Sequence, residues 1–328
     1  MALSPSVPMP AARKRILFVG GSLNQTTMVH AVARELGEFH AAFTPFYDDG
    51  VMGSLARRGL LDFTILAGQA RRATLGYLGD HGLVVDEGGR LGGYDLVVSC
   101  SDLLVPGNLR RTPLVLVQEG MTDPEDWRYR LVKGLGLPRY LANTSMTGLS
   151  HAYRAFCVAS HGFRDLFIRK GVAPERIEVT GIPNFDDSRA LLANDFPLKD
   201  YVLGATSCLR ETLKPENRAA FIKKCLAVAG DRPLVFKLHP NENVARSTAE
   251  IRALAPRARI FSSGHTGHMV ANARALVTKY SSVVFLALAL DKEVHADIPI
   301  ETLRRLLPIQ NGGASAWNIA EVCRRHLN

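Results

Sequence analysis

The sequence of 328 residues lacks any paired spacing of cysteines. Its five cysteines are scattered, and none of them forms a CxxC pair: Cys100, Cys157, Cys208, Cys225 and Cys323. This spacing indicates neither a structural zinc site nor a disulfide framework. Because 47% of the residues are hydrophobic, we expect an ordinary apolar core to hold the fold in a reducing cytoplasm.

Long apolar runs are also absent. No uninterrupted run approaches the roughly 20 residues that a transmembrane helix needs. Residues 1–13 are rich in proline and alanine and contain no apolar core of signal-peptide length. We interpret residues 1–13 as a disordered leader. We expect the protein to be cytoplasmic and to associate peripherally with the inner face of the membrane.

Acidic residues are missing from one long stretch of a chain whose net charge is +9. No acid lies between Asp126 and Asp165, while six basic residues fall there: Arg128, Arg130, Lys133, Arg139, Arg154 and Arg164. Trp127 and several leucines lie among them. This mixture is typical of a helix at an anionic membrane surface. It also fits a solvated helix that packs its tryptophan and leucines into its own domain.

A basic chain also suits nucleic acid, but no helix-turn-helix, RNA-binding or zinc-finger pattern is recognisable. We therefore expect phosphorylated substrates and anionic lipid as the acidic partners, and no nucleic acid.

Strand-like and helix-like segments alternate through both halves of the chain. Short apolar runs that end in polar residues predict buried parallel strands at 15–19, 41–44, 94–100, 112–118, 155–160, 177–184, 201–207, 234–238, 258–261 and 275–278. This order predicts an α/β fold of two doubly wound Rossmann-like domains that face each other across a cleft. We place the domains at 14–190 and 200–312, and expect a C-terminal helix in 313–328 to cross back to the N-terminal domain.

The first predicted strand ends at Gly20-Gly21-Ser22, before a helix. This opening has no GxGxxG pattern and no acid placed to hold a ribose. We interpret Gly20, Gly21 and Ser22 as a tight turn that brings the chain close to an acceptor or a donor phosphate.

The most informative segment is 277–285, a predicted buried strand that stops at Ser281 and Ser282 and turns into an apolar helix. Two hydroxyls and the free N–H groups of a helix start would then point at one spot, which suits a phosphate. The serines also suit a plain helix N-cap, and the two interpretations are compatible.

A second polar strand end follows residue 236. Lys237 and His239 share one face of this strand, because side chains alternate along a strand. We expect His239 to stabilise a departing diphosphate; a structural histidine that fixes the turn at Pro240 is the alternative. The full predicted donor and phosphate set is Thr206, Ser207, Arg210, Lys237, His239, Asn241, Glu242, His265, Tyr280, Ser281 and Ser282. For Arg210, the alternative is a surface ion pair with Glu211.

These motifs resemble those of GT-B type glycosyltransferases. The segment 179–186 (VTGIPNFD) looks like the block that ends the N-terminal domain of many capsule and teichoic-acid transferases. Lys237-Leu238-His239-Pro240, followed by Thr278-Lys279-Tyr280-Ser281-Ser282, is similar to the motif pair of CDP-glycerol glycerophosphotransferases. UDP-GlcNAc 2-epimerases and KDO transferases share a looser form. The resemblance implies a nucleotide-activated donor on the C-terminal domain.

Glu119 follows the strand at 112–118 and precedes Gly120. The glycerophosphotransferases usually carry a histidine there, whereas the epimerases and KDO transferases more often carry an acid. We predict Glu119 to be a general base that deprotonates an acceptor hydroxyl; a loop acid that caps a helix is the alternative. Asp102, at a neighbouring strand end, is the reserve candidate.

The sequence therefore predicts a metal-independent, inverting glycosyltransferase that moves a sugar from a nucleotide-activated donor to a lipid-linked or surface-glycan acceptor. Its acceptor side would comprise Gly20, Gly21, Ser22, Arg128, Arg130 and Lys133. No cofactor is expected, and no metal, because His265 and His268 have no third ligand nearby. A glycerophosphotransferase or a 2-epimerase is the alternative on the same fold. A non-catalytic nucleotide-sugar or nucleic-acid-binding protein is the alternative from another class.

Overall fold

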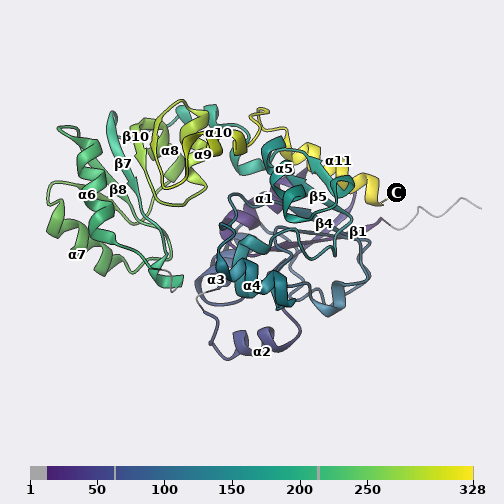
Figure 1. Cartoon of the computed structure of the whole chain (residues 1–328). Coiled ribbons are helices and arrows are strands. Elements are labelled where there is room, and N and C mark those ends of the chain that lie inside the picture. Colours follow the sequence, from purple (N-terminus) through teal and green to yellow (C-terminus); the bar gives the residue numbers. More distant parts are fainter. Residues whose placement is uncertain (1–12, 63, 213–214, 328) are drawn as a thin grey trace, which may run out of the picture.

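The structure is a computed structural model that describes residues 13–62, 64–212 and 215–327. The predicted leader, apart from Arg13, lies outside these residues. The chain forms two α/β domains, each built on one parallel sheet (Figure 1). The predicted fold class is confirmed by these two sheets and by the helices that alternate with their strands.

The N-terminal sheet has six strands in the order β2-β1-β3-β4-β5-β6. Their bounds are β1 Arg15–Gly20, β2 His40–Pro45, β3 Leu96–Ser99, β4 Leu114–Val117, β5 Ala155–Val158 and β6 Ile177–Val179. Strands β3, β4 and β5 are buried along their whole length, as expected for a parallel sheet covered on both faces. The strand order reverses at β1 and β3, so the crevice for a ligand is expected at their carboxyl ends.

The C-terminal sheet has five strands in the order β11-β10-β7-β8-β9. Their bounds are β7 Tyr201–Ala205, β8 Leu234–Lys237, β9 Arg259–Phe261, β10 Ala273–Val277 and β11 Glu293–His295. The order reverses between β7 and β10, which puts the segments after residues 205 and 277 on either side of the second crevice. The sequence did not predict β11, because a three-residue edge strand with charged ends has no apolar run.

The helices begin and end at residues that suit their termini. Their bounds are α1 Leu23–Arg34, α2 Val51–Arg57, α3 Gly68–Asp80, α4 Trp127–Leu135, α5 His161–Lys170, α6 Arg218–Ala229, α7 Val244–Leu254, α8 Thr266–Asn272, α9 Val283–Ala289, α10 Ile300–Leu306 and α11 Ser315–Leu327. Ser22, Asp126 and Ser160 accept N-cap hydrogen bonds for α1, α4 and α5. Gly136 and Gly171 end α4 and α5 with positive φ, which favours glycine.

The two domains are joined by an apolar contact under α9. Phe285 of α9 makes edge contacts with Phe163 of α5 and with Phe185, at ring-centroid distances of 5.9 and 6.3 Å. Burying three aromatic rings at one point favours a single placement of α9 on the N-terminal domain. This contact fixes the start of α9 next to the loops of the first domain.

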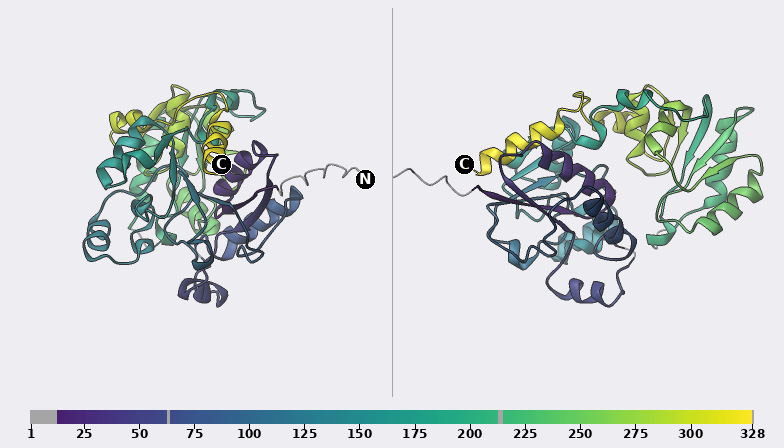
Figure 2. Two further views of the ribbon diagram at one scale, coloured as in Figure 1. Left: turned by 90° about the vertical axis from the view of Figure 1, so that its right-hand side faces the viewer. Right: turned by 180° about the vertical axis from the view of Figure 1, so that it is seen from behind.

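The last two helices, α10 and α11, both contact elements of the N-terminal domain. Helix α10 contacts α5, and an added Cβ at Gly162 would lie 1.9 Å from the carbonyl oxygen of Arg305, so only glycine allows this approach. Helix α11 then lies along α1 (Figure 2), where Arg324 pairs with Glu38 at 2.7 Å. The sequence did not predict α10.

Candidate functional site

Glu119 stands at the carboxyl edge of the N-terminal sheet, directly after β4. The preceding Gln118 is buried; its amide donates to the carbonyl of Gly120 at 2.7 Å and accepts from the N–H of Ala159 at 2.9 Å. These two bonds fix the turn, since a buried amide that loses its partners costs free energy. Glu119 itself is partly exposed.

Three side chains from the start of α1 hold the Glu119 carboxylate. Ser22 donates to Oε1 at 3.0 Å, Asn24 to the same oxygen at 3.5 Å, and Gln25 to Oε2 at 2.6 Å. A carboxylate offers about four lone-pair positions, so these three donors leave one on Oε2. Glu119 is therefore oriented and can still accept one further hydrogen bond.

Gly20 and Gly21 make room for the chain itself. An added Cβ would lie 2.6 Å from Thr26 Oγ1 at Gly20 and 2.1 Å from Gln25 Oε1 at Gly21. Glycine is thus required by the packing of the first turn of α1. Ser22 both caps α1 and binds Glu119, so it belongs to the support of the candidate base.

The segment after β10 packs against the segment after Glu119. The Ser282 hydroxyl accepts from the N–H of Met121 at 2.9 Å, and Tyr280 donates its hydroxyl proton to the carbonyl of Thr122. An added Cβ at Gly120 would lie 2.7 Å from Ser282 Oγ, so this contact also needs glycine. The candidate base and the predicted phosphate segment, far apart in the sequence, are direct neighbours in the fold.

The start of α9 differs from the predicted phosphate cradle in its backbone. The N–H groups of Val283, Val284 and Phe285 already donate to Ser281 Oγ, Ser281 O and Ser282 O, at 3.4, 3.2 and 3.0 Å. These N–H groups are therefore engaged within the turn. A ligand here would meet the hydroxyl groups of the two serines, which can still donate their own protons.

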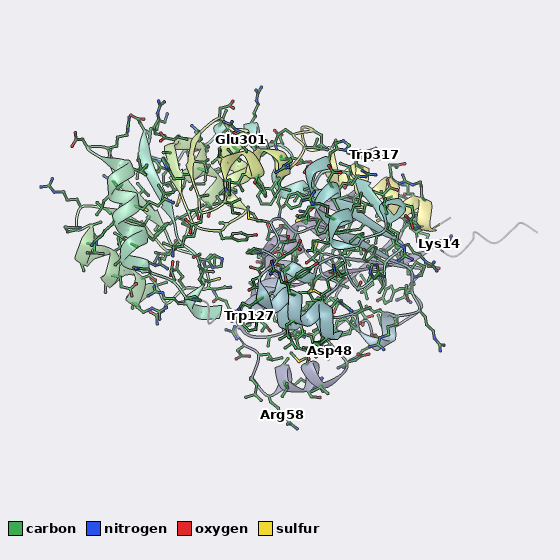
Figure 3. All side chains as sticks on the ribbon, viewed as in Figure 1. Lys14, Asp48, Arg58, Trp127, Glu301 and Trp317 are labelled. Atoms are coloured by element: carbon green, nitrogen blue, oxygen red, sulfur yellow. The ribbon has the colours of Figure 1, made fainter. Side chains whose placement is uncertain are left out.

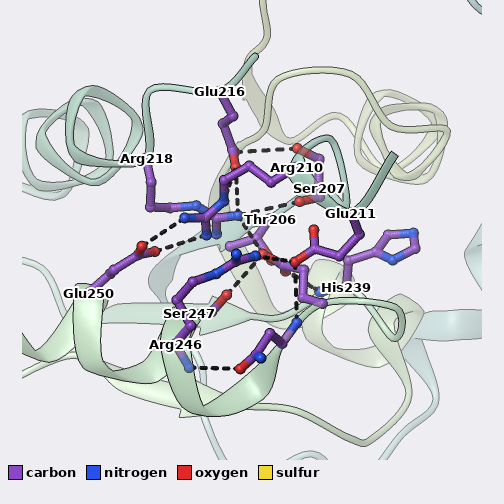
Figure 4. Close-up of polar contacts among 12 residues, drawn as sticks. Thr206, Ser207, Arg210, Glu211, Glu216, Arg218, His239, Arg246, Ser247 and Glu250 are labelled. Atoms are coloured by element: carbon purple, nitrogen blue, oxygen red, sulfur yellow. Dashed lines mark hydrogen bonds and ion pairs between the residues drawn. The ribbon is translucent and has the colours of Figure 1, made fainter. Parts of the chain in front are cut away.

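Glu242 accepts several bonds within a buried ion-pair network of the C-terminal domain. Figure 4 labels its neighbours Thr206, Arg218 and Ser247. The Glu242 carboxylate accepts from the Thr206 hydroxyl, the Arg218 guanidinium, the Ser247 hydroxyl and the N–H of His239. Arg218 also pairs with the buried Glu216 at 2.9 Å. Thr206 and Glu242 thus bind other parts of the domain, and four donors fill the acceptor positions of Glu242.

Arg210 and Lys237 are engaged as well. Arg210 binds both oxygens of Glu250, at 2.7 and 2.9 Å, and this pairing raises the pKa of its guanidinium. The Lys237 ammonium donates to the carbonyl of Leu238 at 2.9 Å, and burial lowers its pKa. Ser207 donates to Glu216 at 3.5 Å. These contacts stabilise the loops of the domain. The Arg210 charge is paired with Glu250, whereas the Lys237 ammonium meets carbonyl oxygens.

His239 differs from its neighbours because its ring keeps a donor. Nδ1 accepts from the N–H of Asn241 at 3.1 Å, which leaves the ring proton on Nε2. Burial lowers the pKa of His239, so the ring is neutral at pH 7. In Figure 4 the imidazole points away from the ion-pair network. The side chain of Asn241 is exposed beside it.

His265 caps α8 and stacks on His268, with ring centroids 4.0 Å apart. Burial is the main cause that lowers the pKa of His265. Among the described residues, no group of three or more His, Cys, Asp or Glu side chains is placed to hold a metal.

Asp102 is fully buried and supports a loop. Both of its oxygens accept from the N–H of Gly148, at 3.0 and 3.1 Å, and Oδ2 also accepts from the N–H of Ser150. A carboxylate enclosed by backbone donors is not available to a substrate hydroxyl. We therefore leave Asp102 out of the proposed catalytic set.

The acid-free stretch forms α4, which has one buried and one exposed side. Tyr129 and Val132 are buried, whereas Trp127 is 67% exposed. The alternative in which this tryptophan packs into its own domain is therefore wrong. Arg128 stacks over the Trp127 ring, and Lys133 donates to the Tyr129 hydroxyl and to the carbonyl of Lys170. Arg130 is exposed. No helix in the described part of the chain has the length and apolarity to cross a bilayer.

Sequence reasoning missed Asn24, Gln25, Glu216 and Arg218. A signal for Gln25 was present, since Ser22-x-x-Gln25 has the spacing of a capping box. Here Gln25 turns its amide to Glu119 instead of to the backbone of Ser22. For Arg218 no signal existed, because nothing in the sequence indicates which acids a buried arginine will meet.

Comparisons with known proteins found similarity in structure only. No family model and no curated protein matches the sequence. Among solved structures, S. aureus MnaA with UDP has a TM-score of 0.63 at 12% identity, covering 96% of this chain and 97% of the other. The UDP-N-acetylglucosamine 2-epimerase from Rickettsia bellii has a TM-score of 0.56 at 11% identity, covering 96% of both chains.

The wall teichoic acid polymerase TagF is similar over 96% of this chain and 89% of its own, with a TM-score of 0.54 at 12% identity. At these identities the likeness shows the fold alone. It agrees with the resemblance of the motifs, and the chain has the GT-B architecture.

Proposed function

We propose that this protein is a metal-independent glycosyltransferase that uses a nucleotide-activated sugar. The observation that carries the proposal is Glu119: three side chains orient its carboxylate, and Met121, two residues later, donates its N–H to Ser282 of the other domain. A carboxylate held at the junction of two Rossmann-like domains, with one acceptor position left, suits a general base.

The proposed reaction is one in-line displacement. Oε2 of Glu119 takes the proton of an acceptor hydroxyl. At the same time, the oxygen of that hydroxyl attacks the anomeric carbon of the donor sugar. The bond to the diphosphate breaks, and the nucleoside diphosphate leaves with the bonding electrons. A single displacement inverts the anomeric centre.

The C-terminal domain would hold the leaving group. His239 donates from Nε2, and Ser281 and Ser282 offer hydroxyl protons. Donors aimed at developing negative charge stabilise a transition state more than the ground state. Arg210, Lys237, Glu242 and Thr206 would act indirectly, because they position the loops that carry His239. The similarity to MnaA, which was solved with UDP, supports a nucleotide as ligand.

A 2-epimerase is the second candidate. The structures similar over nearly the whole of both chains include UDP-N-acetylglucosamine 2-epimerases, and the motif comparison places an acid at this position in epimerases. A glycerophosphotransferase is favoured less, because Glu119 stands where that group usually carries a histidine. An epimerase needs no acceptor, so the exposed apolar side of α4 favours the transferase with a lipid-linked acceptor at the inner face of the membrane.

The test has two stages. Thermal shift against UDP-, CDP-, GDP- and ADP-sugars identifies the donor, since a ligand at a hundred times its Kd adds about 2.7 kcal/mol of stability. Incubation with that donor, with and without lipid extract, then separates the activities. A glycosyltransferase releases nucleoside diphosphate only with an acceptor; an epimerase converts the sugar without one. If no activated sugar binds, the proposal is wrong.

A further inference from the structure

A second cavity, of about 350 Å³, lies in the N-terminal domain away from Glu119. It is formed by α4, by the 3-10 segment η2 (Arg139–Met146) and by the C-terminal end of α5. Its lining combines apolar with basic side chains: Val132, Lys133, Leu137, Arg139, Met146, Leu149, His151 and Lys170. Its volume is within the usual range for small-ligand sites, about 300–1,000 Å³.

Lys170 is the unusual member of this lining. Its side chain is 2% exposed, and the described residues supply no hydrogen bond or ion pair to its ammonium group. The ammonium lies over the rings of Phe167 and Tyr129, at 5.3 and 5.8 Å from their centroids. A buried ammonium with no direct ion pair is costly. Burial lowers the pKa of Lys170 to about 8, although Glu125, Asp102 and Asp123 attract its charged form. An anion bound here would further stabilise the charged ammonium.

Two more cations reach the same cavity. Arg139 donates from Nη2 to the carbonyl of Asp102 at 3.2 Å, while its buried Nε has no partner. The Lys133 ammonium donates to the Tyr129 hydroxyl at 3.1 Å and to the Lys170 carbonyl at 2.7 Å, and a third N–H donor remains.

Three acids attract the Lys170 ammonium, but none of them lines the cavity. Asp102 is enclosed by backbone N–H groups, and Asp123 accepts from the Thr144 hydroxyl at 3.0 Å. Glu125 is exposed and also attracts the Lys170 ammonium. The described lining of the cavity thus contains Lys133, Arg139 and Lys170 and no carboxylate.

The rim of the cavity is apolar and exposed. Trp127, Leu131 and Leu135 follow at intervals of four on the outer side of α4, with 67, 45 and 66% of their surface exposed. Leu137 and Leu141 continue this rim. Figure 3 places Trp127 on the side of the N-terminal domain that faces the C-terminal domain. A leucine and tryptophan surface around a basic cavity matches the interface of an anionic bilayer.

We propose that this cavity binds the phosphate of an anionic phospholipid headgroup, with the exposed side chains of α4 in the acyl boundary. Lys170 and the free Nε of Arg139 bind phosphate oxygens, because a phosphate presents several charged acceptors to converging donors. The site would hold the N-terminal domain at the membrane with the acceptor side near the surface. It does not depend on the proposed transfer reaction.

Vesicle co-sedimentation of the full chain tests the proposal. Phosphatidylcholine vesicles with and without phosphatidylglycerol are compared for the wild type, Lys170→Met, Arg139→Gln and Arg130→Gln. Arg130 is the matched control, because it is exposed on α4 and outside the cavity lining. Loss of one surface charge is expected to weaken binding about fivefold, whereas Lys170→Met and Arg139→Gln should each weaken it more than tenfold. Leu131→Ser with Leu135→Ser should weaken it similarly.

The proposal would be overturned if the wild type and both cavity variants bound equally to the anionic vesicles. It would also be overturned if the wild type bound neutral vesicles as strongly as anionic ones. Titration with inorganic phosphate separates the two sources of phosphate. If phosphate binds in a Lys170-dependent manner while anionic vesicles do not bind, the ligand is a soluble phosphate and the lipid assignment is wrong. Unchanged circular dichroism of each variant confirms that it is folded.

Discussion

The carboxyl edges of the two sheets use their polar residues differently. At the N-terminal edge, Ser22, Asn24 and Gln25 converge on Glu119, whose carboxylate keeps an acceptor position. At the C-terminal edge, most charged side chains pair with one another, as Arg218 does with Glu242. The N-terminal edge orients a single carboxylate toward the domain junction. At the C-terminal edge, most charged side chains pair with one another and stabilise loops.

The difference shows that charge at a strand end is not by itself a binding site. A buried charge must be paired, so a cluster of arginines and glutamates in a crevice can be structural. The residue to examine is the one whose partners leave a donor or an acceptor free. By that criterion Glu119 and His239 are functional candidates, and Arg210 is a support.

The largest effect on turnover, with little effect on stability, is expected from Glu119→Gln. Replacing the base with an isosteric amide should lower the turnover of the activated sugar about 10²–10⁴-fold. The free energy of unfolding should change by less than about 1 kcal/mol, because the group is at the surface. Turnover assays and urea denaturation measure both quantities. Activity within a few fold of wild type would place the base elsewhere.

Glu242→Gln should show the opposite behaviour. It removes one of the two carboxylates that pair with the buried Arg218 guanidinium, Glu216 being the other. Breaking a buried pair should cost about 3–5 kcal/mol of stability. The matched control is Glu301→Gln, whose exposed pair with Arg304 contributes at most about 1 kcal/mol. Urea midpoints compare the two variants. A Glu242→Gln protein as stable as the control would contradict the structural assignment of this network.

Gly120→Ala tests the junction of the two edges. The added methyl would meet Ser282 Oγ at 2.7 Å, and overpacking of this kind costs about 1–3 kcal/mol. The double variant with Ser282→Ala removes the clashing oxygen and should recover most of the loss. A double-mutant cycle by urea denaturation measures the coupling. Purely additive effects would show that the two loops do not meet.

A smaller effect is expected from the pH dependence of donor binding. Burial lowers the pKa of His239 below its ordinary value of 6.5, so the ring is neutral at pH 7 and gains a proton only at lower pH. Affinity for the activated sugar should therefore stay flat down to pH 6.5 and rise below it, as the added positive charge attracts the diphosphate. Calorimetric titration of wild type and His239→Gln checks this. The same rise in the variant would rule out His239 as its source.

Much of the fold could be predicted from the sequence, because buried parallel strands such as β4 are short apolar runs with polar ends. Strand β11 lacks that signal. Helix α10 was not predicted. Its contact with Gly162 is a tertiary contact, which a sequence pattern does not show. In the site, the position of Glu119 at a strand end was predictable from its place after an apolar run. Its three donors were not, and neither was the pairing of Arg210 with Glu250, because hydrogen-bond and ion-pair partners depend on tertiary structure.

The central claim is that a donor bound by the C-terminal edge faces Glu119 at the junction of the two domains. A crystal structure with the nucleoside diphosphate identified by thermal shift tests it most directly. We expect the diphosphate within hydrogen-bond distance of His239 Nε2 and the Ser281 hydroxyl, on the side facing Glu119. A nucleotide bound to the N-terminal domain would contradict the account. So would a nucleotide bound to the C-terminal domain at a place remote from the carboxyl edge of its sheet.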